Sequence, residues 1–177
     1  MLPDRVIRIS AATTSPSRIE RDPWHFVGPE PGTHPAAALP AGPAVVPLAL
    51  WLERRGELSA RRPAVGVWLE PGDDPAAIAA DVDNLAMVAV HFPKFTDGRG
   101  YSTAVLLRTR YGYAGELRAF GDVGRDQLFY MKRCGFDSFA LPAHRDPGAA
   151  LASLEDFRHR YQGSVDDPLP LFRRRHG

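Results

Sequence analysis

The chain contains one cysteine, Cys134, among its 177 residues. A single cysteine forms no disulfide within the chain and supplies no cysteine-rich metal or iron–sulfur site. Long apolar runs are missing too, since none approaches the roughly 20 residues that a membrane-spanning helix needs. Charges interrupt the apolar residues between Met1 and Ser10, where a signal peptide would carry its hydrophobic region. We therefore expect a cytoplasmic protein with no membrane partner.

An excess of charge is also absent, because 22 Lys and Arg balance 21 Asp and Glu to a net charge of +1. Such a chain lacks the overall basic field that binds nucleic acid, so we expect no nucleic-acid partner. The sequence contains no Walker loop, nucleophile elbow, or flavin, haem, iron–sulfur or nucleotide motif. Its six histidines show no metal-ligand spacing. We expect no metal, and the cofactor is left unknown.

What the chain does contain is a set of short apolar runs, each followed by a segment of helical periodicity. Such alternation is typical of parallel βα units. We predict an α/β fold of about four βα units with a parallel sheet. Four units make either half of an eight-unit barrel or a small open, doubly wound sheet. The predicted strands are residues 64–69, 87–92, 117–120 and 138–141.

Local signals predict where several helices begin. Asp74 before Pro75, and Asp146 before Pro147, are typical helix starts. Asp122 is predicted to cap a third helix. The apolar-then-charged run over residues 45–55 predicts a short helix, and a further helical stripe is predicted from the residues Ala150, Leu154, Phe157 and Tyr161.

The chain divides by composition into three parts. Residues 1–43 form a Pro-rich N-terminal arm or linker, in which VIRIS (6–10) and PWHFVG (23–28) are candidate strands of a small hairpin. Residues 44–163 form the βα-repeat domain, and residues 164–177 form a basic C-terminal tail. We expect these three parts from composition alone.

Polar residues crowd into the turns after two predicted strands, and ligands of parallel α/β sheets usually bind at the carboxyl ends of the strands. The turn FPKFTDGRGYS (92–102) opens a helix, whose free N–H groups favour an anion. The alternative is a tight turn in which Asp97 caps the helix and Arg99 pairs with a carboxylate. The anion- or ligand-binding candidates in this turn are Lys94, Thr96, Asp97, Gly98, Arg99, Gly100, Tyr101 and Ser102.

The turn GDVGRDQ (121–127) holds the other candidates, Asp122, Arg125 and Asp126. Asp122 and Asp126 would face Lys94 or Arg99 across the strand ends, as acid–base or metal-binding carboxylates do. The alternative is a helix cap at Asp122 beside a solvated turn.

Three further residues have mainly structural interpretations. Arg118 lies inside a predicted strand, where a buried charge must be paired, and Glu116 or the Asp97 turn is its expected partner. Cys134 shares a helix face with other apolar residues and is expected in the core. His91 is expected to be a core or hydrogen-bonded histidine.

Four blocks of the chain resemble a bacterial family known as domain of unknown function 934: FPKFTDGRGYS, GELRAFGDVGRDQL, RCGFDSF and YQGSVDDPLPLFRRR. Its members are described as oxidoreductases involved in sulfite reduction, since they are encoded beside assimilatory sulfite reductase. The resemblance thus implies sulfur metabolism. It supplies no catalytic residues, so the catalytic residues stay unknown.

These features leave three functions open. The first is an accessory protein of assimilatory sulfite reduction that binds sulfite reductase. The second is an oxidoreductase or other enzyme that binds a small anion or a phosphate-bearing cofactor at the strand ends. The third is a structural module that forms a homodimer. The tail PLPLFRRR supplies the partner-contact candidates Leu171, Phe172, Arg173, Arg174 and Arg175.

Overall fold

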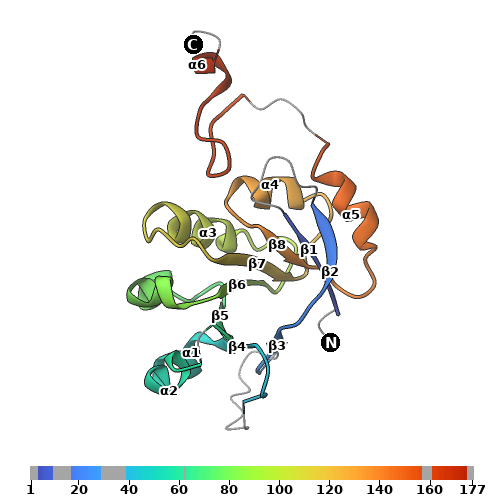
Figure 1. Ribbon diagram of the computed structural model, residues 1–177. Coiled ribbons are helices and arrows are strands. Elements are labelled where there is room, and N and C mark those ends of the chain that lie inside the picture. Colours follow the sequence, from blue (N-terminus) through green and yellow to red (C-terminus); the bar gives the residue numbers. More distant parts are fainter. Residues whose placement is uncertain (1–3, 10–16, 29–38, 62, 157–160, 175–177) are drawn as a thin grey trace.

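Eight strands form one sheet in the computed structural model, which describes residues 4–9, 17–28, 39–61, 63–156 and 161–174 (Figure 1). The strand order is β2-β1-β8-β7-β6-β5-β4-β3. Neighbours from β3 to β8 run parallel, whereas β1 is antiparallel to both β2 and β8. The strands are β1 (Arg5–Arg8), β2 (Arg18–Arg21), β3 (His25–Phe26), β4 (Ala44–Pro47), β5 (Val65–Leu69), β6 (Met87–Phe92), β7 (Glu116–Gly121) and β8 (Ser138–Ala140).

Helices follow each of the strands from β4 to β8, which makes this part a run of βα units. They are α1 (Leu48–Glu53), α2 (Arg55–Ser59), the 3₁₀ helix η1 (Pro75–Asn84), α3 (Arg99–Thr109), α4 (Leu128–Arg133), α5 (Pro147–Ser153) and, near the C-terminus, α6 (Leu171–Arg174). The α/β prediction is confirmed, and the sheet is a curled half-barrel.

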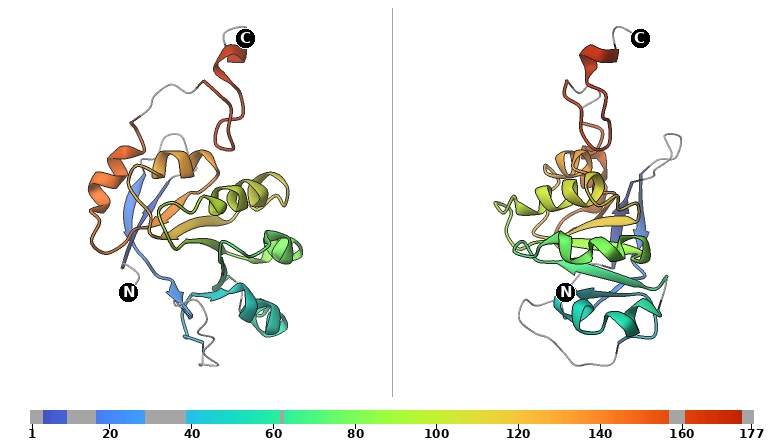
Figure 2. Two further views of the ribbon diagram at one scale, coloured as in Figure 1. Left: turned by 180° about the vertical axis from the view of Figure 1, so that it is seen from behind. Right: turned by 90° about the vertical axis from the view of Figure 1, so that its left-hand side faces the viewer.

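The curl of the sheet follows from how its two edges are connected. Eight flat strands spaced by about 4.8 Å would put β2 and β3 roughly 34 Å apart. Only Asp22, Pro23 and Trp24 separate these strands in sequence, and that connection reaches at most about 14 Å. The sheet must therefore bend until its edges approach each other, and residues 22–24 cross its inner face (Figure 2).

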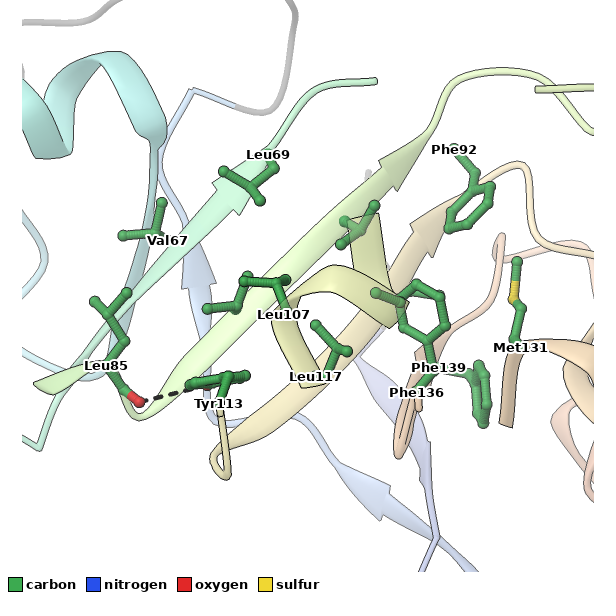
Figure 3. Close-up of a cluster of buried hydrophobic side chains, with 14 of the residues drawn as sticks. Val67, Leu69, Leu85, Phe92, Leu107, Tyr113, Leu117, Met131, Phe136 and Phe139 are labelled. Atoms are coloured by element: carbon green, nitrogen blue, oxygen red, sulfur yellow. Dashed lines mark hydrogen bonds between the residues drawn. The ribbon is translucent and has the colours of Figure 1, made fainter. Parts of the chain in front are cut away.

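The helices lie around the outside of the curled sheet, over the larger of two apolar clusters (Figures 1 and 2). Figure 3 shows Leu107 and Tyr113 packed beside Leu117 of β7. The Tyr113 hydroxyl donates to the carbonyl oxygens of Glu116 (3.0 Å) and Leu85 (3.4 Å), which satisfies its polar group inside the core. These contacts fix the start of β7 relative to the elements around it.

A smaller apolar cluster fills the inner face of the curl. It is covered by Trp24 and Phe26 from the crossing segment and from β3, so the inside of the half-barrel is packed. Its buried members are Val6, Val45, Trp68, Met87, Ala89, Phe120 and Ala140.

Most local helix signals have the predicted effect. Asp74 and Asp146 accept hydrogen bonds from backbone N–H groups at the starts of η1 and α5, each just ahead of its proline. Gly112 and Gly135 have φ values of +67° and +105° after α3 and α4. Glycine adopts these angles without strain, so both positions end a helix as expected.

Three predictions for the remaining elements are wrong in whole or in part. The short helix predicted within residues 45–55 is present as α1, but it begins only at Leu48, because residues 45–47 belong to β4 and pair with β5. VIRIS and PWHFVG do not pair with each other: β1 pairs with β2, and β3 pairs with β4. The stripe ending at Tyr161 is not one helix, since α5 ends at Ser153 and Tyr161 is exposed. Phe157 lies outside the described residues.

Candidate functional site at the carboxyl ends of the strands

The turn after β6 is held by its own side chains. Arg99 donates to both carboxylate oxygens of Asp97, at 3.0 and 2.7 Å, and Asp97 also accepts the Arg99 backbone N–H. This pairing lowers the pKa of the Asp97 carboxyl below its usual value and raises the pKa of Arg99. Helix α3 begins at Arg99 with Gly98 at its cap position, so the turn is tight as predicted, but Asp97 is not the cap residue.

The other predicted residues of this turn differ in their exposure to solvent. Lys94, Thr96, Gly98 and Ser102 are exposed, so they are available to a ligand or a partner. Gly100 is buried, and a Cβ there would lie 2.6 Å from Cζ of Phe92. Tyr101 packs between Phe92 and Tyr130, with ring centroids 5.4 and 5.2 Å away.

The turn after β7 is tied to the turn after β6. The Asp122 carboxylate accepts the Phe95 N–H at 3.0 Å, and the Gln127 side chain donates to the Phe95 carbonyl at 3.0 Å. The prediction that Asp122 caps helix α4 is wrong, because that helix begins at Leu128, with Gln127 at its cap position. The Asp122 carboxylate instead links the two turns, through its hydrogen bond from the Phe95 N–H.

The two predicted groups therefore lie side by side, but their charges do not meet as expected. Asp122 lies 3.8 Å from Arg145, which follows β8, and Arg99 pairs with Asp97. Arg125 and Asp126 are exposed. In the described part of the chain, no three His, Cys, Asp or Glu side chains are arranged to hold a metal ion.

A histidine–carboxylate pair, not predicted from the sequence, lies at the same end of the sheet. Nδ1 of His91, near the end of β6, lies 2.9 Å from Oε2 of Glu70, which directly follows β5. A carboxylate only accepts, so Nδ1 is the donor of this hydrogen bond. The sequence signal that could have identified this pair is His91 itself, a polar residue inside the otherwise apolar run MVAVHF.

The His91 ring is fixed by its surroundings. It stacks on Phe120, with centroids 4.8 Å apart and planes inclined by 18°, and it meets Trp68 edge-on. A Cβ at Gly121 would lie 2.8 Å from Cδ2 of His91. Gly121 also has a φ of +103°, so glycine is required there for two reasons.

An ionic network occupies the inner face near Arg118, whose side chain is 0% exposed. Arg118 donates to Asp22 at 2.6 Å, to Glu116 at 2.7 Å and to Ser138 at 3.1 Å. The predicted pairing with Glu116 is confirmed, and the partner from the crossing segment is Asp22 rather than the Asp97 turn. Arg118 thus attaches the crossing segment to the sheet.

Cys134 is buried at the end of α4, as predicted. Burial raises the pKa of its thiol, the opposite of what a reactive cysteine needs. This geometry makes Cys134 part of the packing.

The C-terminal segment stands away from the body of the protein (Figures 1 and 2). Arg133 of α4 contacts its beginning, donating to the Gln162 carbonyl and to the Ser164 hydroxyl. Large apolar side chains of this segment are exposed, among them Phe172, and Arg173 is exposed as well. Leu171 and Arg174 belong to α6, and Arg175 lies outside the described residues.

The fold and these contacts define an α/β protein in which hydrogen bonds join the turns after β6 and β7 at the carboxyl ends of the strands. The chain belongs to the family described as bacterial protein of unknown function (DUF934), whose model matches residues 66–172. The match runs from β5 to α6, so β1 to β4 lie before it. A comparison with curated proteins found no match. Over the described ranges, no helix is long and apolar enough to cross a membrane.

Proposed function

We propose that this protein is a cytoplasmic accessory protein of assimilatory sulfite reduction that binds the sulfite reductase system. The observation that carries the proposal is the exposed C-terminal segment, residues 161–174. Tyr161, Leu169 and Phe172 are 70, 56 and 52% exposed within this short stretch. Clustered exposed apolar side chains typically mark a protein–protein contact.

The chemistry of the segment also indicates the kind of surface it would meet. Arg173 adds positive charge beside Phe172, and arginine and aromatic side chains are frequent anchors of protein interfaces. An apolar groove with an acidic rim would fit this segment. The connection to the reductase rests on the family resemblance, since members are described as encoded beside assimilatory sulfite reductase.

The test is a binding measurement between the full-length protein and purified sulfite reductase from the same organism, by isothermal titration calorimetry. We expect Phe172→Ala to weaken binding by about tenfold or more, which corresponds to about 1.4 kcal/mol or more, as for an interface anchor. Leu52→Ala is the matched control, because Leu52 is an exposed leucine on α1. Its binding should equal that of the wild type.

Two results would contradict the proposal. One is absence of binding by the wild-type protein at micromolar concentrations. The other is self-association, measured by analytical ultracentrifugation, that Phe172→Ala abolishes while reductase binding stays unchanged. That second result would assign the segment to a homodimer instead.

A further inference from the structure

We propose that Glu70 and His91 form a general-base site, in which Nε2 of His91 takes a proton from an O–H group of a small substrate or of water. The site is separate from the C-terminal segment and does not depend on a partner. It lies at the carboxyl ends of β5 and β6, where ligands of parallel sheets usually bind.

The first argument is that one nitrogen of His91 is committed and the other is open. Nδ1 donates to Glu70 at 2.9 Å, which leaves the lone pair of the neutral ring on Nε2. Within the described part of the chain Nε2 has no hydrogen-bond partner, and it is not one of the buried unsatisfied atoms. The His91 side chain is 14% exposed, so a small molecule can reach part of the ring.

The second argument is that the imidazole is held in one orientation before any substrate arrives. Phe120 covers one ring face, Trp68 approaches edge-on, and Gly121 lies against Cδ2. With Glu70 on Nδ1, the ring has little freedom to rotate. A base fixed in this way needs no reorganisation when a proton is transferred.

The third argument concerns charge and an unfilled hydrogen-bond position. Proton uptake turns the ring into an imidazolium, which the Glu70 carboxylate stabilises, as an acidic residue does for catalytic histidines elsewhere. Oε1 of Glu70 is buried and has no partner among the described residues, a costly state that a donor from substrate or water would relieve.

The surroundings also limit the substrate. The side chains of His91 and Glu70 are 14 and 29% exposed, so only part of each is available to a ligand. The acceptor atom Nε2 requires a donor, which favours a hydroxyl compound or water. The proton passes from the substrate oxygen to Nε2 and then to product or solvent, so the step needs no oxidant or reductant.

The first experiment uses diethyl pyrocarbonate, which modifies neutral imidazole nitrogens, with each histidine followed by mass spectrometry. His144 is the internal control, because it is exposed and follows β8. We expect His91 to react at least as fast as His144 despite its low exposure. Glu70→Gln should slow the modification of His91, because a neutral amide accepts the Nδ1–H less strongly than a carboxylate does.

The second experiment measures hydrolysis of p-nitrophenyl acetate by the full chain. We expect wild type and His144→Gln to hydrolyse the ester equally, and His91→Gln and Glu70→Gln to be about tenfold slower. Circular dichroism verifies that each variant is folded. The proposal is overturned if His91 of the wild type stays unmodified while His144 reacts, or if all four proteins hydrolyse the ester at one rate.

Discussion

Replacement of Arg118 by methionine removes the positive charge that holds the crossing segment against the sheet. The methionine side chain would fill much of the same space, but Asp22 and Glu116 would keep their buried carboxylates. Asp22 would lose its 2.6 Å ion pair, whereas Glu116 would retain Arg8 at 3.1 Å. Asp22 therefore loses its ion-pair partner, whereas Glu116 keeps a second one.

The expected magnitude follows from the burial of these groups. The side chains of Asp22 and Glu116 are 6 and 10% exposed, so water cannot replace the lost partner. Breaking a buried pair by removal of one member costs about 3–5 kcal/mol. For a chain of this size, that loss lowers the melting temperature by roughly 6–20 °C.

The assay is urea unfolding at neutral pH, followed by circular dichroism, for Arg118→Met, Asp22→Asn and the double variant. We expect the double variant to be more stable than Arg118→Met, because it no longer buries an unpaired Asp22 charge. Strictly additive single effects would refute the reasoning. So would a midpoint for Arg118→Met equal to that of the wild type.

Three further predictions concern single residues. In the native state Cys134 should react slowly with a thiol-specific disulfide reagent, because burial raises the pKa of its thiol and leaves less thiolate. In urea it should react rapidly, and a fast reaction in the native state would contradict this prediction. Gly121→Ala should lower the free energy of unfolding by about 1–3 kcal/mol, because φ is +103° there, and an unchanged urea midpoint would disprove the strain. Asp146→Ala should cost about 1 kcal/mol by the same assay, since it removes hydrogen bonds to Gly148 and Ala149, whereas Asp146→Asn should cost less.

The parts of the fold that follow from local signals could be predicted from the sequence. The strand at 87–92 was predicted with its observed bounds, because a short apolar run ends in a polar turn there. Only the first residues of the run 45–55 were misassigned: residues 45–47 form part of β4, since a continuous apolar run does not distinguish a buried strand from a helix. The pairing of β3 with β4 could not be predicted, because it depends on contacts across a Pro-rich stretch.

The candidate site shows the same division between local and distant contacts. The Asp97–Arg99 pair lies within one turn, and the alternative interpretation anticipated that Arg99 pairs with a carboxylate, without naming Asp97 as that partner. The Glu70–His91 pair joins a residue just after β5 to a residue of β6, which only the parallel register of these strands brings together. Arg118 was expected to find an acidic partner nearby, and Glu116 fits, but the role of Asp22 depends on the curl of the whole sheet.

The place of β1 and β2 at the edge of the sheet has a consequence for synthesis of the chain. Ile7 in β1 pairs with Phe139 in β8, so a segment made early requires one made much later. At about 5–20 residues per second, the roughly 130 intervening residues take on the order of ten seconds to make. Until then β1 lacks this partner, and its apolar side chains Val6 and Ile7 depend on chaperones or on transient contacts to avoid aggregation.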